Sequence, residues 1–510
     1  MFRLLGLLGG LSVTTDMGTG APLEESLERC IVATRLARVV GLADAEVSDV
    51  LYTSLLEHLG CTAYSHEVAS VWGDDVAPAR QAFLTDFSKP ADVWRSWIPG
   101  VADATGRSRA RVLATMLTSG RKVETEGPVA TCDVARSASR RLRLPSSVQA
   151  GLSHVFAMWN GKGYPRVQGE EIPRSTRIAH VASTAVLFAN RAGAVAAARE
   201  VRRRSGSYLD PQLADAFTSQ SDHLLEGLGD IDAYQAVLDY EPDPVRLVTD
   251  DELDEVARTF GDLVDLKSPS LHGHSTGVGD LAAAAAATLL SGHEVRALRI
   301  AGYLHDLGRA GVSSRIWDKP GPLSRTERDQ ARLHPYHSER ILSRVPALAE
   351  VAKLAGEHHE RCDGTGYHRG ATAVQLTLPS RVLATADAYR CLIEGRPHQP
   401  ALPSGQTAER LRADVRAGHL DADAVAAVLQ AAGHRDGPRR ARPAGLTERQ
   451  VAVLRLVAAG LSNREIATRL GISSRTAEHH VQDVYLKIGA SSRAGAALFA
   501  MQHGLLDRSR

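Results

Sequence analysis

The 510-residue sequence lacks an apolar run long enough to cross a bilayer. Its longest runs, Leu4 to Val13 and Leu281 to Leu290, fall short of the roughly 18 to 20 residues that a membrane helix needs. The first run follows Arg3 and could be read as a signal peptide. However, Thr14-Thr15-Asp16 comes next and no small-x-small cleavage site is present. We therefore expect neither a membrane span nor export.

Cysteine is scarce and does not occur in pairs. An odd number of cysteines without regular spacing argues against a disulfide framework and against a zinc knuckle. This composition favours a reducing compartment, so we expect a cytoplasmic protein that has no membrane partner. The five cysteines are Cys30, Cys61, Cys132, Cys362 and Cys391.

The chain also lacks a strong overall charge, since its formal net charge is +1. The charge is nevertheless uneven. Residues 436–510 hold twelve Lys/Arg and six Asp/Glu, a net charge of +6, which leaves about −5 on the rest. A basic segment is typical of a region that binds a polyanion. With 44% apolar and 23% charged residues, the chain is expected to hold two to four globular domains.

Histidines and carboxylates gather in the third quarter of the sequence. His305-Asp306 and His358-His359 are two adjacent pairs, and His274, His334 and Asp387 lie around them. Imidazole and carboxylate groups are the side chains that bind first-row transition metals. The two adjacent pairs could supply ligands to two ions. The pattern therefore predicts a metal site.

The order of these motifs resembles the HD-GYP phosphohydrolase family over residues 250 to 435. The matches are His274-Ser275, His305-Asp306-x-Gly308, His334-Pro335, His358-His359-Glu360, Asp363-Gly364-x-Gly366-Tyr367, Ala386-Asp387 and Arg396-Pro397. The resemblance implies hydrolysis of cyclic di-GMP or a related phosphodiester at a centre of two or three metals. It implies metal-ligand roles for His274, His305, Asp306, His334, His358, His359 and Asp387.

The resemblance also implies further roles. Asp306 and Arg309 are assigned to catalysis, with Asp306 as the bridging ligand, while Gly366, Tyr367 and Arg396 are assigned to substrate binding. The residue one helical turn before His274 is Ser270 rather than a carboxylate. We therefore expect two divalent transition-metal ions, Fe, Mn or Zn, rather than three.

Three residues depart from the family pattern. Arg309 replaces a lysine, His368 replaces the proline of Gly-Tyr-Pro, and Gln399 replaces a basic residue. Arginine keeps the positive charge but has a different fork geometry. Two functions therefore remain open: a metal-dependent phosphodiesterase, and a catalytically inactive domain that senses a phosphorylated nucleotide.

The first half of the chain contains three segments that are similar to these motifs. Residues 54–60 align with 302–308, 159–165 with 362–368, and 177–183 with 381–387. Glu57 and His58 then occupy the positions of the His-Asp pair. The positions of His358, His359 and Asp387 are taken by residues that bind metals poorly, namely Val155, Phe156 and Ser183. We therefore expect a degenerate copy that cannot hold the same metal centre.

The basic end of the chain has a second recognisable pattern. Two short helices are expected to meet at a glycine turn between residues 446 and 473, followed by a helix from Ser474 to Gly489 that is polar on one face. This pattern resembles the LuxR-type helix-turn-helix over 446 to 506 and implies binding to double-stranded DNA. Base edges and phosphates would be contacted by Arg475, Thr476, His479, His480, Gln482 and Lys487.

The segment 493–503 carries Ala496, Ala497, Phe499 and Ala500, which is apolar enough to predict pairing into a homodimer. The expected fold is all-α, with two helical HD-type domains in tandem followed by a small helix-turn-helix domain. The expected bounds are 1–245, 246–432, a linker at 433–445, and 446–510. The expected protein is a DNA-binding transcriptional regulator that hydrolyses or senses a cyclic dinucleotide or another phosphorylated nucleotide.

Overall fold

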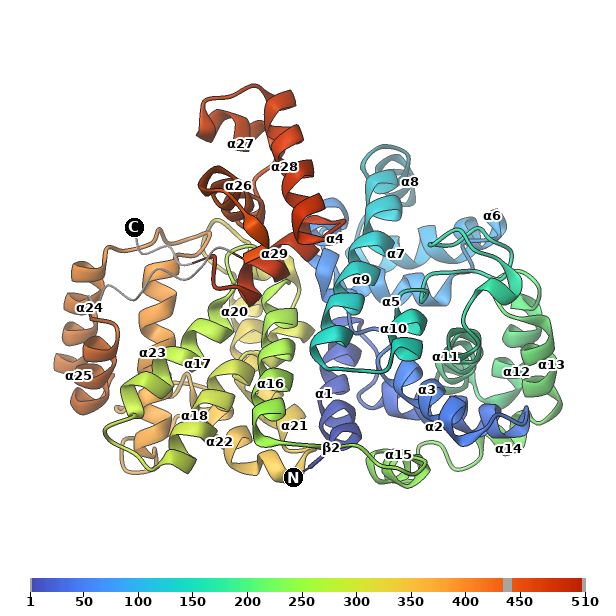
Figure 1. Ribbon diagram of the computed structural model, residues 1–510, viewed down its shortest axis with the longest axis horizontal. Coiled ribbons are helices and arrows are strands. Elements are labelled where there is room, and N and C mark those ends of the chain that lie inside the picture. Colours follow the sequence, from blue (N-terminus) through green and yellow to red (C-terminus); the bar gives the residue numbers. More distant parts are fainter. Residues whose placement is uncertain (1, 434–442, 507–510) are drawn as a thin grey trace. The chain divides into compact units, whose positions relative to one another are not determined.

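The computed structural model describes residues 2–433 and 443–506, and the chain in it divides into two compact units, residues 1–253 and 254–510. Nearly all of the regular secondary structure in both units is helical (Figure 1). Within the described residues the only sheet has two short antiparallel strands, β1 (Phe2–Arg3) and β2 (Leu247–Val248), with Phe2 opposite Val248. The predicted all-α class is therefore confirmed.

Unit 1 begins with three helices, α1 (Leu4–Gly18), α2 (Glu25–Val39) and α3 (Asp44–Leu55). The first apolar run of the sequence forms α1, whose leucines are buried inside the unit. No helix in the described part of the chain is both long enough and apolar enough to span a bilayer.

The rest of unit 1 is also helical. Its core is built mainly from buried aliphatic side chains of α2, α3 and the helices that follow residue 174. These further helices are α4 (Ser65–Trp72), α5 (Val76–Leu84), α6 (Pro90–Asp92), α7 (Ile98–Thr105), α8 (Arg109–Thr115), α9 (Arg121–Arg141), α10 (Ser146–Leu152), α11 (Arg174–Ala192), α12 (Ala194–Arg204), α13 (Pro211–Ser219), α14 (Ser221–Leu225) and α15 (Ala233–Tyr240).

The helices from residue 250 to residue 431 carry the histidine-rich motifs. They are α16 (Asp250–Asp265), α17 (His274–Ala286), α18 (Gly292–Leu304), α19 (Ser314–Trp317), α20 (Arg325–Arg332), α21 (His334–Leu342), α22 (Ala349–Glu357), α23 (Leu378–Glu394), α24 (Ser404–Arg416) and α25 (Ala422–Ala431). Ser324 and Glu327 form a capping box at the start of α20. His334 begins a separate helix, because Pro335 lacks an N–H and cannot continue α20.

The same buried contact recurs in both units. In unit 1, Asp16 at the end of α1 accepts hydrogen bonds from the backbone N and Oγ of Ser26 in α2. In unit 2, Asp265 at the end of α16 accepts the same two bonds from Ser275 in α17. The helices α1 to α3 therefore correspond to α16 to α18, and Glu25 corresponds to His274.

A second recurring contact lies later in each unit. Arg177 donates to the carbonyl of Ile172 and to Asp210, at 3.0 and 2.7 Å. Arg381 donates in the same way to Leu376 and Asp421, at 3.2 and 2.9 Å. Arg177 and Arg381 occupy matching positions in the aligned sequence segments. The contacts therefore support the interpretation that the two segments are copies of one element.

The C-terminal helices are α26 (Glu448–Ala458), α27 (Asn463–Leu470), α28 (Ser474–Ile488) and α29 (Arg493–Gln502). The glycine turn expected between the two short helices is Gly460, between α26 and α27, with a φ of +80°, and Gly471 ends α27 with a φ of +65°; glycine adopts both conformations without strain. Ser473 caps the following helix by accepting from the N–H of Thr476. Most of the expected linker, residues 434–442, and the last four residues of the chain lie outside the described residues.

Candidate metal centre

The predicted ligands come together at the ends of helices in unit 2. His274 is the first residue of α17, His305 follows α18, His334 begins α21 and His358 follows α22. Six of the seven predicted ligands are no more than 2% exposed. The exception is His359, whose side chain is 22% exposed. The centre is therefore shielded from solvent on most sides and is accessible to solvent on the side of His359.

Asp306 lies in the middle of the cluster. Its Oδ2 is 3.1 Å from Nε2 of His305 and 3.6 Å from Nε2 of His274. Its Oδ1 faces the other way, 3.2 Å from Nε2 of His334 and 3.6 Å from Nε2 of His358. One carboxylate thus has a different oxygen directed at each of two histidine pairs.

Asp387 from α23 completes the cluster. Its Oδ1 lies 3.1 Å from Nε2 of His274 and 3.8 Å from Nε2 of His305, while its Oδ2 lies 3.7 Å from Nδ1 of His359. Within the described residues, three groups of His, Cys, Asp or Glu could each hold an ion, and all three lie here. They are His334, His358 and His359; His274, His305 and Asp306; and His274, Asp387 and Cys391.

Helix ends fix the orientation of three of the imidazoles. The last carbonyls of a helix have no partner inside the helix. In each case Nδ1 bonds to the carbonyl three residues earlier, which leaves Nε2 directed toward Asp306. The pairs are His305 with Gly302, His334 with Ala331, and His358 with Ala355, at 2.8, 2.6 and 2.6 Å.

The buried charges shift the pKa values of the cluster. Burial alone would raise the pKa of Asp306, but Arg309 and His305 hold it well below its usual range. Burial lowers the pKa of His334 to about 4. Burial, together with the neighbouring His358, also lowers the pKa of His359 well below its usual range. His305 differs: burial alone would lower its pKa, but Asp306 and Asp387 raise it to about 10. Metal binding at His305 would therefore displace a proton from its imidazole.

The residues present fit a metal ion. Nε2 of His274 and Nε2 of His305 are buried and make no hydrogen bond to any residue that the structure describes. Both nitrogens instead lie 3.1 Å from a carboxylate oxygen, Asp387 for His274 and Asp306 for His305, which is an arrangement of donors that suits a shared cation. A set of nitrogen and oxygen donors suits Fe, Mn or Zn.

The predicted catalytic arginine borders the centre. Nη2 of Arg309 is 2.9 Å from Oδ2 of Asp306, and its guanidinium lies 5.0 Å from the ring centroid of Trp317. Arg309 is 4% exposed, so this contact is shielded from solvent. The ring of Trp317 faces the guanidinium, which is an arrangement that favours arginine over lysine.

The predicted substrate residues differ in their surroundings. The ring of Tyr367 lies 4.8 Å from that of His359 and 5.0 Å from the guanidinium of Arg332. A Cβ at Gly366 would lie 2.5 Å from the backbone of Glu360, so no larger residue fits there. Arg396 instead donates to the protein itself, to the carbonyl of Ser270 at 2.9 Å and to Sγ of Cys391 at 3.2 Å.

Two residues at the centre were missed in the sequence. Glu394 accepts a hydrogen bond from Nδ1 of His274 at 2.7 Å, and Cys391 lies within 4.8 Å of the ligand atoms of His274 and Asp387. On α23, Cys391 comes four residues after Asp387 and Glu394 comes seven residues after it. These spacings place all three side chains on one helix face, which is the signal that would have found them.

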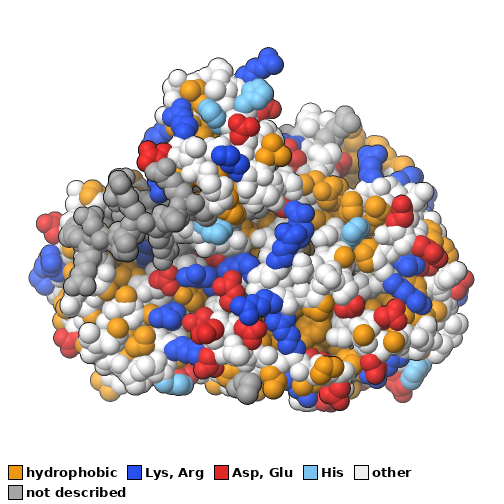
Figure 2. Space-filling view, in the orientation of Figure 1, with side chains coloured by type: hydrophobic (Ala, Val, Ile, Leu, Met, Phe, Trp, Pro, Cys, Tyr) orange, Lys and Arg blue, Asp and Glu red, His pale blue; other side chains and the backbone are white. Residues whose placement is uncertain are grey.

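The predicted DNA-binding residues lie on α28. Arg475, Thr476, His479, Gln482 and Lys487 are exposed, and His480 is half-buried. Figure 2 shows Lys, Arg and His side chains with a few acidic ones on the visible face of the helix-turn-helix, at the top of the view. Lys487 also donates to Oε1 of Gln450 at 2.9 Å, so its ammonium is held against α26.

The basis for predicting a homodimer was wrong. Ala496, Ala497 and Ala500 are no more than 1% exposed within the single chain. Helix α29 packs on α26, and the small side chains that were expected to face a second copy are already covered within the chain. The composition of a helix indicates an apolar face but does not identify its partner.

The comparisons with known proteins agree with both parts of this architecture. The HD domain family matches residues 258–424, and the family of bacterial regulatory proteins called luxR matches residues 444–500. The chain is 46% identical over 61 residues to the transcriptional regulatory protein YdfI of Bacillus subtilis, which covers 12% of this chain and 29% of that protein.

A longer similarity covers both units. The chain is 31% identical over 414 residues to 3'3'-cGAMP-specific phosphodiesterase 3 of Vibrio cholerae, covering 79% of this chain and 89% of that protein. The crystal structure of the cyclic GMP-AMP specific phosphodiesterase V-cGAP3 of V. cholerae matches with a TM-score of 0.58 and 26% identity, over 84% of this chain and 97% of that one. HD domain phosphodiesterases are metal-dependent. The chain therefore belongs to the HD-GYP-type phosphodiesterase family and ends in a LuxR-type helix-turn-helix domain.

Proposed function

We propose that this protein is a metal-dependent phosphodiesterase for a cyclic dinucleotide, joined to a DNA-binding transcriptional regulator. One observation carries the proposal: the two carboxylate oxygens of Asp306 face different histidine pairs, as a ligand shared by two ions would. The domain arrangement proposed is 1–245, 246–432, a linker at 433–445 and 446–510, and the proposed location is the cytoplasm.

The donor atoms divide into two sets. We propose that His274, His305, Asp306 and Asp387 hold one divalent ion, and that His334, His358, His359 and Asp306 hold the other. Fe, Mn and Zn all suit these nitrogen and oxygen donors. When bound, such ions lower the pKa of water to near neutrality and offset negative charge on a phosphoryl group.

The surrounding residues would bind and orient the phosphodiester. Arg309 supplies a fixed positive charge next to Asp306, in a buried position where charge interactions are strong. The ring of Tyr367 beside the partly exposed His359 offers a surface at the open side of the centre. Gly366 allows the chain to pass close to Glu360 and thereby places Tyr367. Arg396, which was predicted to contact substrate, would act as a positioning residue because its donors bond to Ser270 and Cys391.

The helix-turn-helix supports the second part of the proposal. The exposed polar face of α28 would enter the major groove of double-stranded DNA. A homodimer on a two-fold DNA site is still proposed, because such domains commonly bind paired half-sites, but α29 does not supply its interface.

The test is hydrolysis by the full-length protein. Purified protein would be analysed for bound metal and incubated with 3'3'-cGAMP and with cyclic di-GMP, and the products separated by chromatography. We expect about two equivalents of metal and cleavage of at least one of the two dinucleotides. Asp306→Ala should lose both metal and activity, whereas His293→Ala, which alters an exposed histidine of α18, should keep both.

A second function, ligand sensing without turnover, is favoured by the replacements at Arg309, His368 and Gln399. Tight binding of a dinucleotide by metal-loaded protein, with no product after prolonged incubation, would support sensing and contradict the enzymatic proposal.

A further inference from the structure

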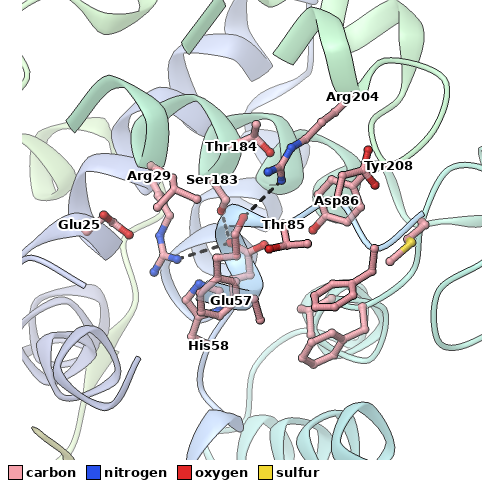
Figure 3. Close-up of a pocket in the computed structure, with 17 residues that line it drawn as sticks. Glu25, Arg29, Glu57, His58, Thr85, Asp86, Ser183, Thr184, Arg204 and Tyr208 are labelled. Carbon is pink, nitrogen blue, oxygen red and sulfur yellow. Dashed lines mark hydrogen bonds and ion pairs between the residues drawn. The ribbon is translucent and has the colours of Figure 1, made fainter. Parts of the chain in front are cut away.

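Unit 1 contains a cavity of about 120 Å³ where a metal centre would lie if this unit resembled unit 2 (Figure 3). The counterparts of the unit 2 ligands border it: Glu25, Glu57, His58, Val155, Phe156 and Ser183. The structure thus brings together residues that the sequence aligned only in separate segments. The cavity remains although the side chains that would bind metal are mostly replaced.

Aromatic rings form much of the cavity wall. Phe83, Phe87, Phe156 and Tyr208 border it, and the ring of His58 lies 4.4 Å from that of Phe83. Burial lowers the pKa of His58 well below its usual range, so this imidazole is neutral at pH 7. Flat aromatic walls favour a planar occupant.

Arg29 supplies donors that the protein does not use. This residue is 2% exposed, and neither its Nε nor its Nη2 makes a hydrogen bond to any residue in the described part of the chain. The nearest carboxylates form ion pairs at longer range, Asp16 at 3.5 Å and Glu57 at 3.9 Å. A buried donor without an acceptor is destabilising, so these N–H groups favour an added ligand that accepts hydrogen bonds.

The other charged groups around the cavity have partners. Glu25 forms two hydrogen bonds with Arg80, at 2.7 and 2.8 Å. Arg204 donates to Glu200 at 2.6 Å and to the carbonyl of Leu84 at 3.1 Å. Asp86 accepts from Ser88, and Glu57 accepts from Ser183 (Figure 3). Arg29 is therefore the charged residue of this wall whose hydrogen bonds are left to a ligand.

The carboxylates restrict the charge of that ligand. Glu57 already lies close to the single positive charge of Arg29, and Asp16 joins it when its carboxyl is ionised, so an anionic ligand would add a further negative group to one guanidinium. A neutral ring avoids this repulsion if it presents a carbonyl to Arg29 and an N–H to Glu57. Such a pair of neighbouring groups is the amide edge of a lactam.

The size of the cavity restricts the ligand further. A dry cavity of about 150 Å³ accepts benzene, so a cavity of this order holds one ring. We propose that the unit 1 cavity is a metal-free binding site for a single planar lactam ring, the chemistry of a pyrimidine base. In place of metal ligands, the first copy would then use Arg29 as a hydrogen-bond donor and Glu57 as an acceptor to recognise a small neutral molecule.

The experiment uses the full-length protein with His305→Ala, so that the centre in unit 2 cannot bind in its place. Uracil and benzoate serve as probes, and their dissociation constants are measured by ligand-observed NMR titration. We expect saturable binding of uracil and at least tenfold weaker binding of benzoate. Arg29→Met should weaken uracil binding at least tenfold, because it removes the donors while keeping much of the side-chain volume.

A second variant guards against misfolding of Arg29→Met, which leaves two carboxylates without their arginine. Leu187 borders the cavity, and Leu187→Phe should fill it and abolish uracil binding without altering any charged group. The proposal is overturned if uracil does not bind, if benzoate binds as well or better, or if Leu187→Phe binds uracil with unchanged affinity. None of these results depends on whether unit 2 hydrolyses a nucleotide.

Discussion

Oε2 of Glu394 lies 2.7 Å from Nδ1 of His274, on the side of the imidazole that faces away from Asp306. This carboxylate fixes the ring so that Nε2 points into the centre. Outer partners of this kind orient a ligand and raise its basicity. The other ligands at helix ends use backbone carbonyls for the same purpose, but His274 starts its helix and has no preceding helical turn to supply one.

Glu394→Gln should weaken metal binding by about 10- to 100-fold, which is the usual cost of losing an outer partner. Retention of metal against increasing chelator, followed by elemental analysis, measures the effect. Glu350→Gln is the matched control, because Glu350 lies 3.7 Å from the exposed His293 and outside the centre. Equal retention in both variants would show that Glu394 does not support the site.

Arg309→Met should lower kcat/KM for a cyclic dinucleotide by about 100-fold, because it removes a buried positive charge that would face the phosphodiester. Arg309→Lys should retain more activity than the methionine variant, since the charge remains while the contact with Trp317 is lost. Steady-state kinetics and metal content are measured together, so that metal loss is separated from loss of phosphate binding.

The matched control for Arg309 is Arg299→Met, which removes an arginine that pairs with Asp254 and lies away from the centre. Wild-type kcat/KM in Arg309→Met would remove this residue from the proposed mechanism. A fall in the control as large as that in Arg309→Met would mean that any loss of charge in unit 2 disturbs activity.

Asp16 should make the stability of the protein depend on pH. Burial raises the pKa of Asp16 from 3.8 to about 7 despite the opposing effect of Arg29. The folded protein therefore binds a proton that the unfolded chain releases, and this stabilisation is full below pH 3.8 and is lost as the pH rises toward 7. The change is about 1.4 kcal/mol per pH unit within that window.

The free energy of unfolding of Asp16→Asn should therefore rise relative to that of the wild type as the pH is raised from 5 to 7. Above pH 7 the difference between the two proteins should stay nearly constant. Urea denaturation of the full chain at several pH values gives this difference. Asp103→Asn, at an exposed position of α7, should follow the wild-type curve. Parallel curves for wild type and Asp16→Asn would contradict the raised pKa.

The DNA-binding proposal is tested with two residues of α28. Arg475→Ala should weaken binding to all duplexes and reduce the slope of log affinity against log salt by about one, because one phosphate contact is lost. Gln482→Ala should instead relax the preference for particular base pairs. Fluorescence anisotropy with a preferred and a scrambled duplex distinguishes them, and Arg412→Ala, exposed on α24, should change neither.

Sequence motifs predicted most of the residues that the structure gathers around Asp306, because histidines and carboxylates are chemically distinctive and occur here in a fixed order. Glu394 was missed because a carboxylate on a polar helix face is common, and only packing shows that it meets His274. The role of Ala496 was misread because an apolar helix face packs equally well within a chain or between chains.

Strand pairing brings the beginning and the end of unit 1 together. Phe2 pairs with Val248, and the backbone N–H of Leu4 donates to the carbonyl of Arg246 at 2.8 Å. A domain whose entry and exit points are neighbours can be inserted, duplicated or permuted in a gene with little disturbance to the rest of the chain. Closure by a two-residue ribbon thus gives a physical route by which tandem duplication of an ancestral gene yields two copies that each fold as a unit and then diverge independently.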